Sequence, residues 1–304
     1  MIRIGPAGWS YPDWEGVVYP RKKPKGFHAL RVISRYFDCV EINSSFYALP
    51  EAKNAAAWAR HVGDRPDFRF TAKLFSGFTH EPVPESARTW QVSMDAFERG
   101  LEPLLNANRL GAILAQFPLG FRRSDASEDR LARISQLLAD RMPGTARILE
   151  VRHGSWFGSE SLATLEHQGW SLAEIDLPEP PRQSATWHPP KDVPQVGPVG
   201  YLRLHGRNVE TWFDPRSGRD AKYDYLYTQG EVQEMIERAR RVSGQRDESY
   251  VVTNNHFGGQ AVANGLEISS GLKQRRVPAP SDLVRAFPRL SESTELEGQR
   301  ELFE

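Results

Sequence analysis

The sequence has a single cysteine, Cys39, and therefore excludes an internal disulfide. That residue lies in an apolar run, so we interpret its thiol as buried and unreactive. No apolar run reaches the roughly 18 residues of a membrane-spanning helix, and the chain does not start with a charged segment followed by an apolar one. These absences predict a soluble, cytoplasmic protein without a membrane partner.

Neither sign of charge is in excess. The 304 residues include 39 Lys and Arg and 39 Asp and Glu. A neutral chain has no global field that attracts nucleic acid or membrane, so electrostatic recognition has to come from local groups. Hydrophobic residues make up 39% of the chain and aromatic residues 11%, which is enough for a large core.

Short apolar runs alternate with helical patterns along most of the chain. Strands that alternate with helices predict parallel βαβ units, and eight such units close a TIM-type (β/α)8 barrel. An open, doubly wound sheet is the alternative, but it requires a GxGxxG turn after the first strand, where this chain reads GPAGWS. The eight expected strands lie near residues 2–8, 39–46, 68–74, 110–117, 146–152, 171–176, 200–206 and 249–255.

The expected organisation is a single α/β barrel domain with a C-terminal tail. We place the barrel at residues 1–273 and the tail at residues 274–304. From Gln274 onward the chain is polar and interrupted by proline, which is typical of a mobile segment outside a domain.

Polar residues end most of the expected strands, and several come in pairs two residues apart. Residues i and i+2 of a strand share a face, so each pair points the same way. In a parallel barrel the carboxyl ends of the strands meet at one mouth, where a buried charge needs a partner or a ligand. The residues that we expect at this mouth are Glu41, Asn43, Lys73, Gln116, Glu150, Arg152, Asp176, Arg203, His205, Asn254 and Asn255.

Structural alternatives exist for the same residues. The charged members can pair only with one another and stabilise the barrel interior. Gln116 can hydrogen-bond a neighbouring strand, and Asp176 can cap the loop that follows its strand.

The cations at this mouth favour an anionic ligand. Arg152 and Arg203 can hold a phosphate or carboxylate through paired hydrogen bonds, and Lys73 adds a point charge. Glu41 and Glu150 are then candidate general bases, and their pKa values depend on the balance between burial and the neighbouring cations.

His205 completes the set of catalytic candidates. Together with Glu150 and Asp176 it forms the alternative, a set of ligands for a divalent metal. The nearby cations oppose a bare metal ion, and the chain has no HxH, HxxxH or CxxC spacing. We therefore expect neither a metal nor a cofactor.

Three long loops follow strands and carry aromatic and basic residues. Bases stack on exposed rings while cations hold phosphates, so contact with nucleic acid is one hypothesis and packing of the loops is the other. His153 and Trp156, in RHGSWF, are expected just outside the mouth as ligand-binding residues, again with loop packing as the alternative. Gly258 and Gly259 lie at a helix start that suits a phosphate, and the alternative is an ordinary glycine turn.

Several motifs together resemble the family called domain of unknown function 72, or YecE-like. The matching stretches are GWSYPDW with VYP, VEINSSFYALP, FRFTAKL with FTH, LGAILAQFPLGF, ILEVRHGSWF, YLRLHGR, and NN followed by AVANGL. The resemblance implies a TIM-type barrel related to sugar isomerases and to metal-dependent endonucleases that act at abasic sites. It implies no particular activity. The chain departs from the family pattern at VVTNN, at ANGL and at GPAGW.

The last residues, GQRELFE, place Gln299, Leu302 and Phe303 in a Q-x-x-L-F arrangement. It resembles the peptides by which bacterial repair and replication proteins bind the sliding clamp, with two apolar anchors for a hydrophobic pocket. The alternative is that these side chains fold back onto the barrel.

Two functions are therefore open. The first is an enzyme-like pocket for an anionic ligand, which is a phosphorylated small molecule, a nucleotide or nucleic acid, with hydrolase or phosphodiesterase chemistry. The second is a non-catalytic nucleic-acid-binding module that the clamp recruits to DNA repair or replication. The sequence does not name the substrate or the oligomeric state.

Overall fold

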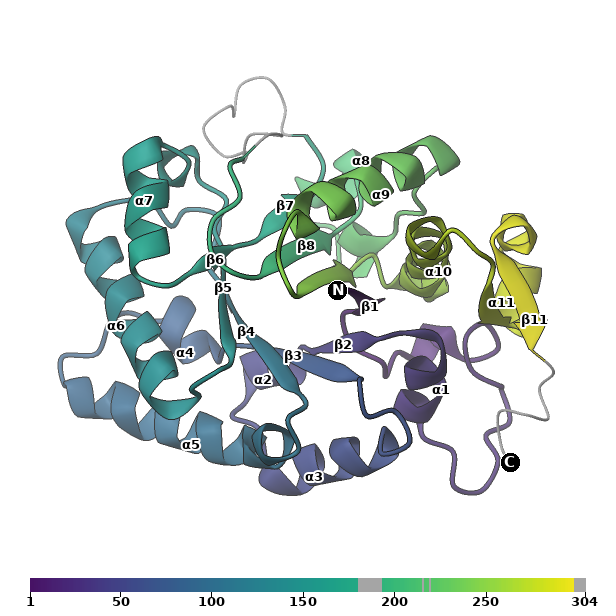
Figure 1. Ribbon diagram of the computed structural model, residues 1–304, viewed down its shortest axis with the longest axis horizontal. Helices are drawn as coiled ribbons and strands as arrows, with labels where there is room; N and C mark the ends of the chain where they lie inside the picture. The colour runs from purple at the N-terminus through teal and green to yellow at the C-terminus, as the bar shows by residue number, and fades with distance from the viewer. Residues whose placement is uncertain (180–192, 215, 219, 298–304) are drawn as a thin grey trace.

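The computed structural model describes residues 1–179, 193–214, 216–218 and 220–297. Figure 1 shows the strands gathered in the middle of the molecule with helices around them. Strands and helices follow one another along residues 2–273, and the paired strands are parallel. The expected α/β class with parallel strands is therefore confirmed.

The central strands form two parallel sheets. The order of the first sheet is β2-β3-β4-β5-β6, and that of the second is β1-β9-β8-β7. The first sheet contains β2 (Cys39–Ile42), β3 (Arg69–Lys73), β4 (Leu110–Gln116), β5 (Ala146–Glu150) and β6 (Ser171–Leu172). The second contains β1 (Ile2–Pro6), β7 (Glu174–Asp176), β8 (Gly200–Leu204) and β9 (Ser249–Thr253).

The two sheets meet at both of their edges. Between β1 and β2, the Asp38 N–H donates to the Ile4 carbonyl at 3.0 Å and the Gly8 N–H donates to the Glu41 carbonyl at 2.9 Å. A Cβ on Gly5 would lie 1.7 Å from the Cys39 carbonyl oxygen, so only glycine permits this approach. At the other edge, Ala173 separates β6 from β7. The described strands therefore form two adjoining parallel sheets, not one continuous ring of paired strands.

Helices connect the strands and cover the sheets. The long helices are α1 (Ala29–Tyr36), α3 (Ala52–His61), α5 (Ala87–Asn106), α6 (Asp125–Arg141), α7 (Ser159–His167), α9 (Gln229–Ser243) and α10 (Gln260–Lys273). Short helical segments near strand ends include α2 (Ser44–Tyr47), α4 (Ser76–Thr79), α8 (Val209–Trp212), η4 (Asp220–Tyr223) and η5 (Phe257–Gly259). Among the described residues, no helix combines the length and the apolar character needed to cross a membrane.

Local sequence explains where two of these helices begin. Ser124 and Ser127 form a reciprocal capping box at the start of α6, and Thr228 and Glu231 form another at the start of α9. Each box satisfies backbone N–H groups that have no partner within the helix.

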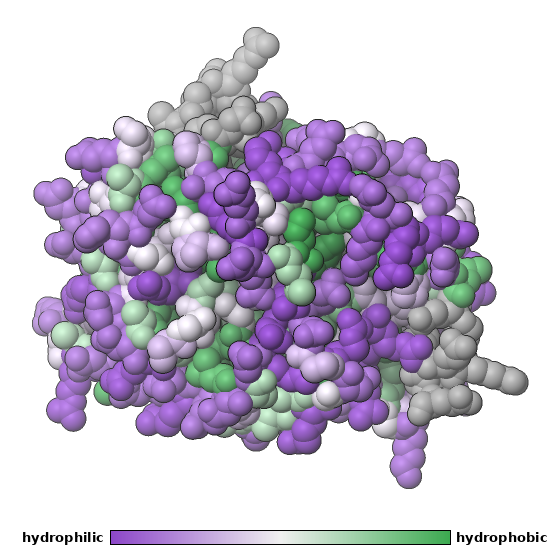
Figure 2. All heavy atoms as spheres, in the orientation of Figure 1, coloured by the Kyte–Doolittle hydropathy of each residue, from purple (hydrophilic) through white to green (hydrophobic). Residues whose placement is uncertain are grey.

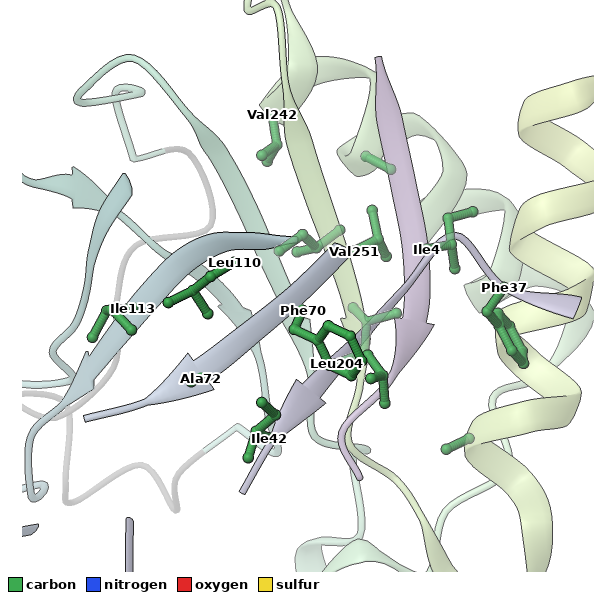
Figure 3. Packing of buried hydrophobic residues seen from close by; sticks show 14 of the residues in the cluster. Ile4, Phe37, Ile42, Phe70, Ala72, Leu110, Ile113, Leu204, Val242 and Val251 are labelled. Carbon is green, nitrogen blue, oxygen red and sulfur yellow. The ribbon is translucent and has the colours of Figure 1, made fainter. Parts of the chain in front are cut away.

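The main hydrophobic core lies between the strands and the helices. Figure 3 shows part of it, with Ile4, Phe70 and Val251 projecting from three different strands. Phe37, at the end of α1, packs closely against α10 at Gly265. The face drawn in Figure 2 is mostly hydrophilic, with apolar residues in small separate patches. The helices therefore bury their apolar sides against the strands.

Residues 277–297 form a folded segment where we expected part of a polar tail. β10 (Val277–Pro280) pairs with β11 (Thr294–Glu297), and α11 (Ser281–Ala286) and η6 (Pro288–Glu292) connect them. Leu283 and Leu290 are fully buried, and Arg289 binds Glu267 of α10 at 2.8 Å. Spaced apolar residues thus anchor an otherwise polar sequence. Gln299, Leu302 and Phe303 lie outside the described residues, so the clamp peptide stays a prediction.

Candidate functional site

The carboxyl ends of the strands hold a buried group of charged side chains. Glu41 comes from β2, Glu150 from β5 and Arg203 from β8, and none of the three is more than 1% exposed. On β8, Arg203 alternates with Leu202 and Leu204, which belong to the apolar core. The strand therefore turns its polar side chains inward and its leucines towards the helices.

Arg203 bridges the two carboxylates. Its Nη2 donates to Glu41 Oε1 at 2.6 Å and its Nε to Glu41 Oε2 at 3.0 Å, while Nη1 donates to Glu150 Oε2 at 2.8 Å. Burial alone would lower the pKa of the Arg203 guanidinium, but the two carboxylates outweigh it and raise that pKa. Arg203 is therefore a fixed cation that joins β2 to β5.

Tyr201 supports this bridge from the same face of β8. Its hydroxyl donates to Glu41 Oε2 at 2.9 Å and lies 2.9 Å from Thr71 Oγ1. We did not predict Tyr201. Its place two residues before Arg203 could have revealed it, because Tyr201, Arg203 and His205 are spaced two residues apart and so share one face of the strand.

Glu150 is saturated by its neighbours. Arg152 Nη2 donates to Oε1 at 2.7 Å, and His205 Nε2 lies 3.6 Å from the same oxygen. Burial favours a neutral carboxyl, but Arg203 and Arg152, with a contribution from His205, hold the pKa of Glu150 well below its ordinary value. A carboxylate held in this way is a weak proton acceptor. The structural alternative, in which the charges pair with one another, therefore describes Glu41, Glu150 and the two arginines.

His205 is buried in its neutral form. The Asn254 side-chain amide lies 3.0 Å from Nδ1; when that amide donates, the ring proton is on Nε2, which faces Glu150. Burial lowers the pKa of His205 to about 4, despite the opposing effect of Glu150. His205 does not line the cavity described below, and its polar contacts are with Glu150, Asn254 and Arg203.

Lys73 differs from the other cations of the group. It is the last residue of β3, and its Nζ lies 4.2 Å from the centre of the Phe46 ring. Throughout the described ranges, no carboxylate oxygen lies within 4 Å of that nitrogen. Burial, and next the nearby Arg203, lower the pKa of Lys73 to about 8.

A cavity of about 290 Å³ opens above these side chains. It receives residues from the carboxyl ends of strands in both sheets. Its lining consists of Gly8, Trp9, Ser10, Tyr11, Asn43, Ser44, Tyr47, Lys73, Gln116, Arg203, Tyr223, Asn254 and His256. Asn43 Oδ1 is buried and accepts no hydrogen bond from the residues that the structure describes. An acceptor left in this state suits a ligand that brings a donor.

Aromatic rings close one side of the site. Trp212 and Tyr223, from the segment between β8 and α9, lie 5.8 and 6.2 Å from the His205 ring. Tyr223 continues to His256 at 5.1 Å, and His256 stacks on Tyr11 at 4.4 Å. These four side chains, Tyr11, Trp212, Tyr223 and His256, form what we call the aromatic wall. The sequence marked two of the loops as aromatic but did not reveal that their rings meet.

The expected position of Asp176 is wrong. Its carboxylate receives Arg207 Nη2 at 2.6 Å, Arg238 Nη1 at 2.5 Å and the Tyr227 hydroxyl at 2.7 Å. Arg238 belongs to α9, so Asp176 points to the helix layer and not to the cavity. The physical reason is register, because Asp176 pairs with Leu204, whose side chain also faces the core between strands and helices.

The residues of the alternative metal site are therefore not assembled. The side chain of Asp176 points towards the helices, whereas those of Glu150 and His205 point to the opposite face of the sheets. In the ranges that the structure describes, no group of three His, Cys, Asp or Glu side chains is arranged to hold a metal ion.

Asn255 also lies apart from its neighbour Asn254. Its Nδ2 donates to the Tyr225 carbonyl at 2.9 Å and to Asn264 Oδ1 at 2.9 Å. Adjacent residues of an extended chain point to opposite faces, so only Asn254 reaches the cavity.

Two other expected ligand-binding residues pack their own loop. Trp156 is fully buried, and its Nε1 donates to the Phe121 carbonyl at 2.8 Å. His153 accepts a hydrogen bond from the Ser155 N–H at 3.2 Å and caps the turn at Gly154–Trp156 (η2). The loop-packing alternative describes both residues.

The glycine turn before α10 does not present a free phosphate site. The Gly258 N–H donates to Asp13 Oδ2 at 2.6 Å, so a carboxylate from the loop after β1 already occupies this position. Asp13 takes the place that we expected for a ligand anion.

Comparison with known proteins places this architecture among relatives. A family model described as "Protein of unknown function DUF72" matches residues 3–286. The chain is 29% identical over 281 residues to UPF0759 protein YunF of Bacillus subtilis (strain 168), which covers 88% of this chain and 93% of that protein. It is 30% identical over 158 residues to UPF0759 protein YecE of Escherichia coli (strain K12), which covers 52% of this chain and 50% of that one.

Solved structures give the same result. A crystal structure of a DUF72 family protein from Thermotoga maritima MSB8 is similar with a TM-score of 0.74 and 30% identity, over 90% of this chain and 99% of that chain. A DUF72 family protein from Enterococcus faecalis V583 is similar with a TM-score of 0.75 and 24% identity, over 90% and 96%. The resemblance seen in the sequence motifs is confirmed.

Proposed function

This chain belongs to the DUF72 family of proteins of unknown function, and we propose that its cavity binds a small anionic molecule and acts on it as an enzyme. A cavity of about 290 Å³ is close to the lower end of the range for small-molecule pockets, roughly 300 Å³. Polar groups from several strand ends converge on it, as is typical of sites in parallel α/β folds.

One observation carries this proposal, the unmatched charge of Lys73. The group contains two carboxylates, Glu41 and Glu150, and three cations, Arg203, Arg152 and Lys73. The two arginines are paired with the two carboxylates, so one positive charge is left and it faces the cavity. A partly buried cation without a carboxylate is stabilised by an anionic ligand.

The proposal changes the roles that the sequence suggested. Lys73 becomes the residue that contacts the anion and exchanges protons with it, because a pKa of about 8 lets it take both protonation states near neutral pH. Glu41 and Glu150 become positioning residues that fix Arg203, which also lines the cavity.

We also propose that the two sheets are halves of one closed TIM-type barrel. The hydrogen bonds between β1 and β2 and the direct chain connection through Ala173 support this. In such a barrel the carboxyl ends of the strands carry the active site, which is where the cavity lies.

A thermal-shift experiment tests the proposed function. The full chain is heated with inorganic phosphate, glycerol 3-phosphate, nucleotides or short oligonucleotides. A ligand at about 100 times its Kd stabilises by about 2.7 kcal/mol, which for a chain of this size raises Tm by about 5 °C.

The variants decide the interpretation. Lys73→Met should abolish the shift. Lys53→Met is the matched control, because Lys53 is exposed on α3 and pairs with Glu51. A shift that survives Lys73→Met, or one that only oligonucleotides produce and that salt removes steeply, would overturn the proposal in favour of nucleic acid binding elsewhere.

A further inference from the structure

Lys73 projects from a rigid part of the molecule. Its carbonyl accepts a hydrogen bond from Ser45 Oγ at 2.7 Å, and the next N–H, that of Leu74, donates to the Leu114 carbonyl at 2.9 Å. Lys73 also pairs with Leu114 in the register of β3 and β4. A side chain that starts from a strand fixed on both sides reaches the same place in every molecule, as precise chemistry requires.

The surroundings of its amine are partly apolar, and the nearby carboxylates are bound by other cations. The ring of Phe46 lies 4.2 Å from Nζ. The charged and titratable groups that act on Lys73 are Arg203, Glu41, Glu150 and Arg152, with His80 on the side of α4. The two carboxylates among them are already bound by arginines, so neither is available to hold the ammonium.

These surroundings favour the neutral amine. The pKa of Lys73 is lowered from 10.5 to about 8 by burial and next by Arg203. At pH 7.5 about one quarter of such amines are neutral, a fraction roughly two orders of magnitude larger than for an ordinary lysine. Only the neutral amine has the lone pair that attacks an electrophile.

We propose that Lys73 Nζ is a nucleophile that forms an imine with an aldehyde or ketone that also carries a phosphate or carboxylate. The inference rests on the proposed function and deepens it by naming the substrate class. The protonated form of Lys73 attracts the anionic group of the substrate, which then lies against Arg203 in the same cavity lining, and the carbonyl group meets the neutral amine.

The step balances without a further reactant. The nitrogen lone pair attacks the carbonyl carbon, and the carbonyl oxygen takes up a proton to give a carbinolamine. The C–O bond then breaks and the oxygen leaves as water, whose two hydrogens account for the two protons that the amine nitrogen has given up. The product, a carbon–nitrogen double bond, draws electrons from the neighbouring carbon and so eases removal of a proton or cleavage of a bond there.

The cavity contains groups that can hold the rest of such a substrate. Asn43 Oδ1 is a buried acceptor without a partner among the described residues, and the Gln116 and Asn254 amides line the same space. Amides of this kind bind the hydroxyl groups of a sugar-like carbonyl compound.

Reductive trapping tests the inference. The full chain is incubated separately with dihydroxyacetone phosphate and with pyruvate at pH 7.5, borohydride is added, and the adduct is located by peptide mass spectrometry. Borohydride converts an imine into a stable secondary amine. We expect one adduct per chain at Lys73, formed at least about tenfold faster than at exposed Lys53, because of the larger neutral fraction. The two compounds distinguish phosphate from carboxylate recognition.

Two variants separate this inference from the proposed function. Lys73→Arg keeps the positive charge but cannot form an imine, so it should lose the adduct and keep the thermal shift with glycerol 3-phosphate. Lys73→Met should lose both. An adduct that is absent from Lys73, or that spreads equally over exposed lysines, overturns the inference. If glycerol 3-phosphate still shifts the wild type in that case, the proposed function stands; if no anion does, both fall.

Discussion

Tyr201 and Arg203, two residues apart on β8, donate to the same oxygen of Glu41, Tyr201 from 2.9 Å and Arg203 from 3.0 Å. The other oxygen of Glu41 receives Arg203 Nη2. Glu41 is thus a fully satisfied buried anion, and its environment is that of a structural support for Arg203.

Replacement of Glu41 should therefore destabilise the fold. Glu41→Gln leaves the buried Arg203 with one carboxylate in place of two, and removal of one partner of a buried ion pair costs about 3–5 kcal/mol. Urea denaturation measures the loss. Glu51→Gln is the control, because Glu51 makes its ion pair with Lys53 at the surface, and it should change the free energy of unfolding very little. Equal effects of the two substitutions would contradict this account of Glu41.

Lys73 should make stability depend on pH in the alkaline range. Its pKa in the folded protein is about 8 and its ordinary value is 10.5, so between these values the unfolded chain binds more protons. The contribution of Lys73 to the free energy of unfolding therefore becomes more favourable as pH rises from about 8 to 10.5. Below pH 8 Lys73 destabilises the folded protein by its full amount.

Lys73→Met removes that effect. We expect the variant to be more stable than the wild type at pH 7, and the difference to shrink as pH increases from 8 to 10, as measured by urea denaturation at each pH. Lys53→Met should not stabilise the protein, because a hydrogen bond to Glu51 shifts the pKa of Lys53 upward. A Lys73→Met variant that is less stable than the wild type at pH 7 would show that burial of the charged amine does not destabilise the folded protein.

The contact between β1 and β2 should tolerate no side chain at Gly5. Gly5→Ala places a Cβ 1.7 Å from the Cys39 carbonyl oxygen, and backbone has to move to relieve this overlap. We expect a loss of at least about 2 kcal/mol in the free energy of unfolding. Gly120→Ala is matched in chemistry, and its Cβ meets nothing within 4 Å, so it should be near neutral. A neutral Gly5→Ala would mean that the two sheets do not adjoin at this edge.

The segment 277–297 should contribute to the stability of the whole domain. Leu290→Ala removes a fully buried side chain, and such substitutions cost about 2–5 kcal/mol. Leu296→Ala makes the same chemical change at a side chain that is 66% exposed, and we expect an effect within about 0.5 kcal/mol. Thermal or urea denaturation compares the pair, and a single transition that shifts only for Leu290→Ala supports an integral segment.

Much of the site could be read from residue spacing. Arg203 and His205 share a face of β8, and the same rule brought Glu41, Glu150 and Lys73 to one end of the sheets, because parallel strands place equivalent ends together. The i, i+2 spacing shows that two side chains share a face of a strand, but it does not show whether that face points to the cavity or to the helices. Asp176 has the same polar character as Glu150, yet it pairs with Leu204 and so points to α9.

Contacts between loops could not be read in this way. The stacking of Tyr11 on His256 joins residues from opposite ends of the chain, and no local pattern encodes it. The folded segment after Gln274 was missed for a related reason. Leu283 and Leu290 stand among polar residues, and only the fold makes them core residues: η6, which carries Leu290, contacts α10, and Leu283 lies near Gly259 at the start of α10.

The pairing of β1 with β9 has a consequence for how the protein forms. Ile2 is the register partner of Ser249, and Trp14 Nε1 donates to the His256 carbonyl at 2.7 Å. The cavity lining thus brings Tyr11 against His256, residues some 240 positions apart. Such long loops close slowly and late in folding. During synthesis on the ribosome β1 can pair with β9 only after residues 249–253 have emerged, so the cavity cannot bind its ligand until most of the chain has been made.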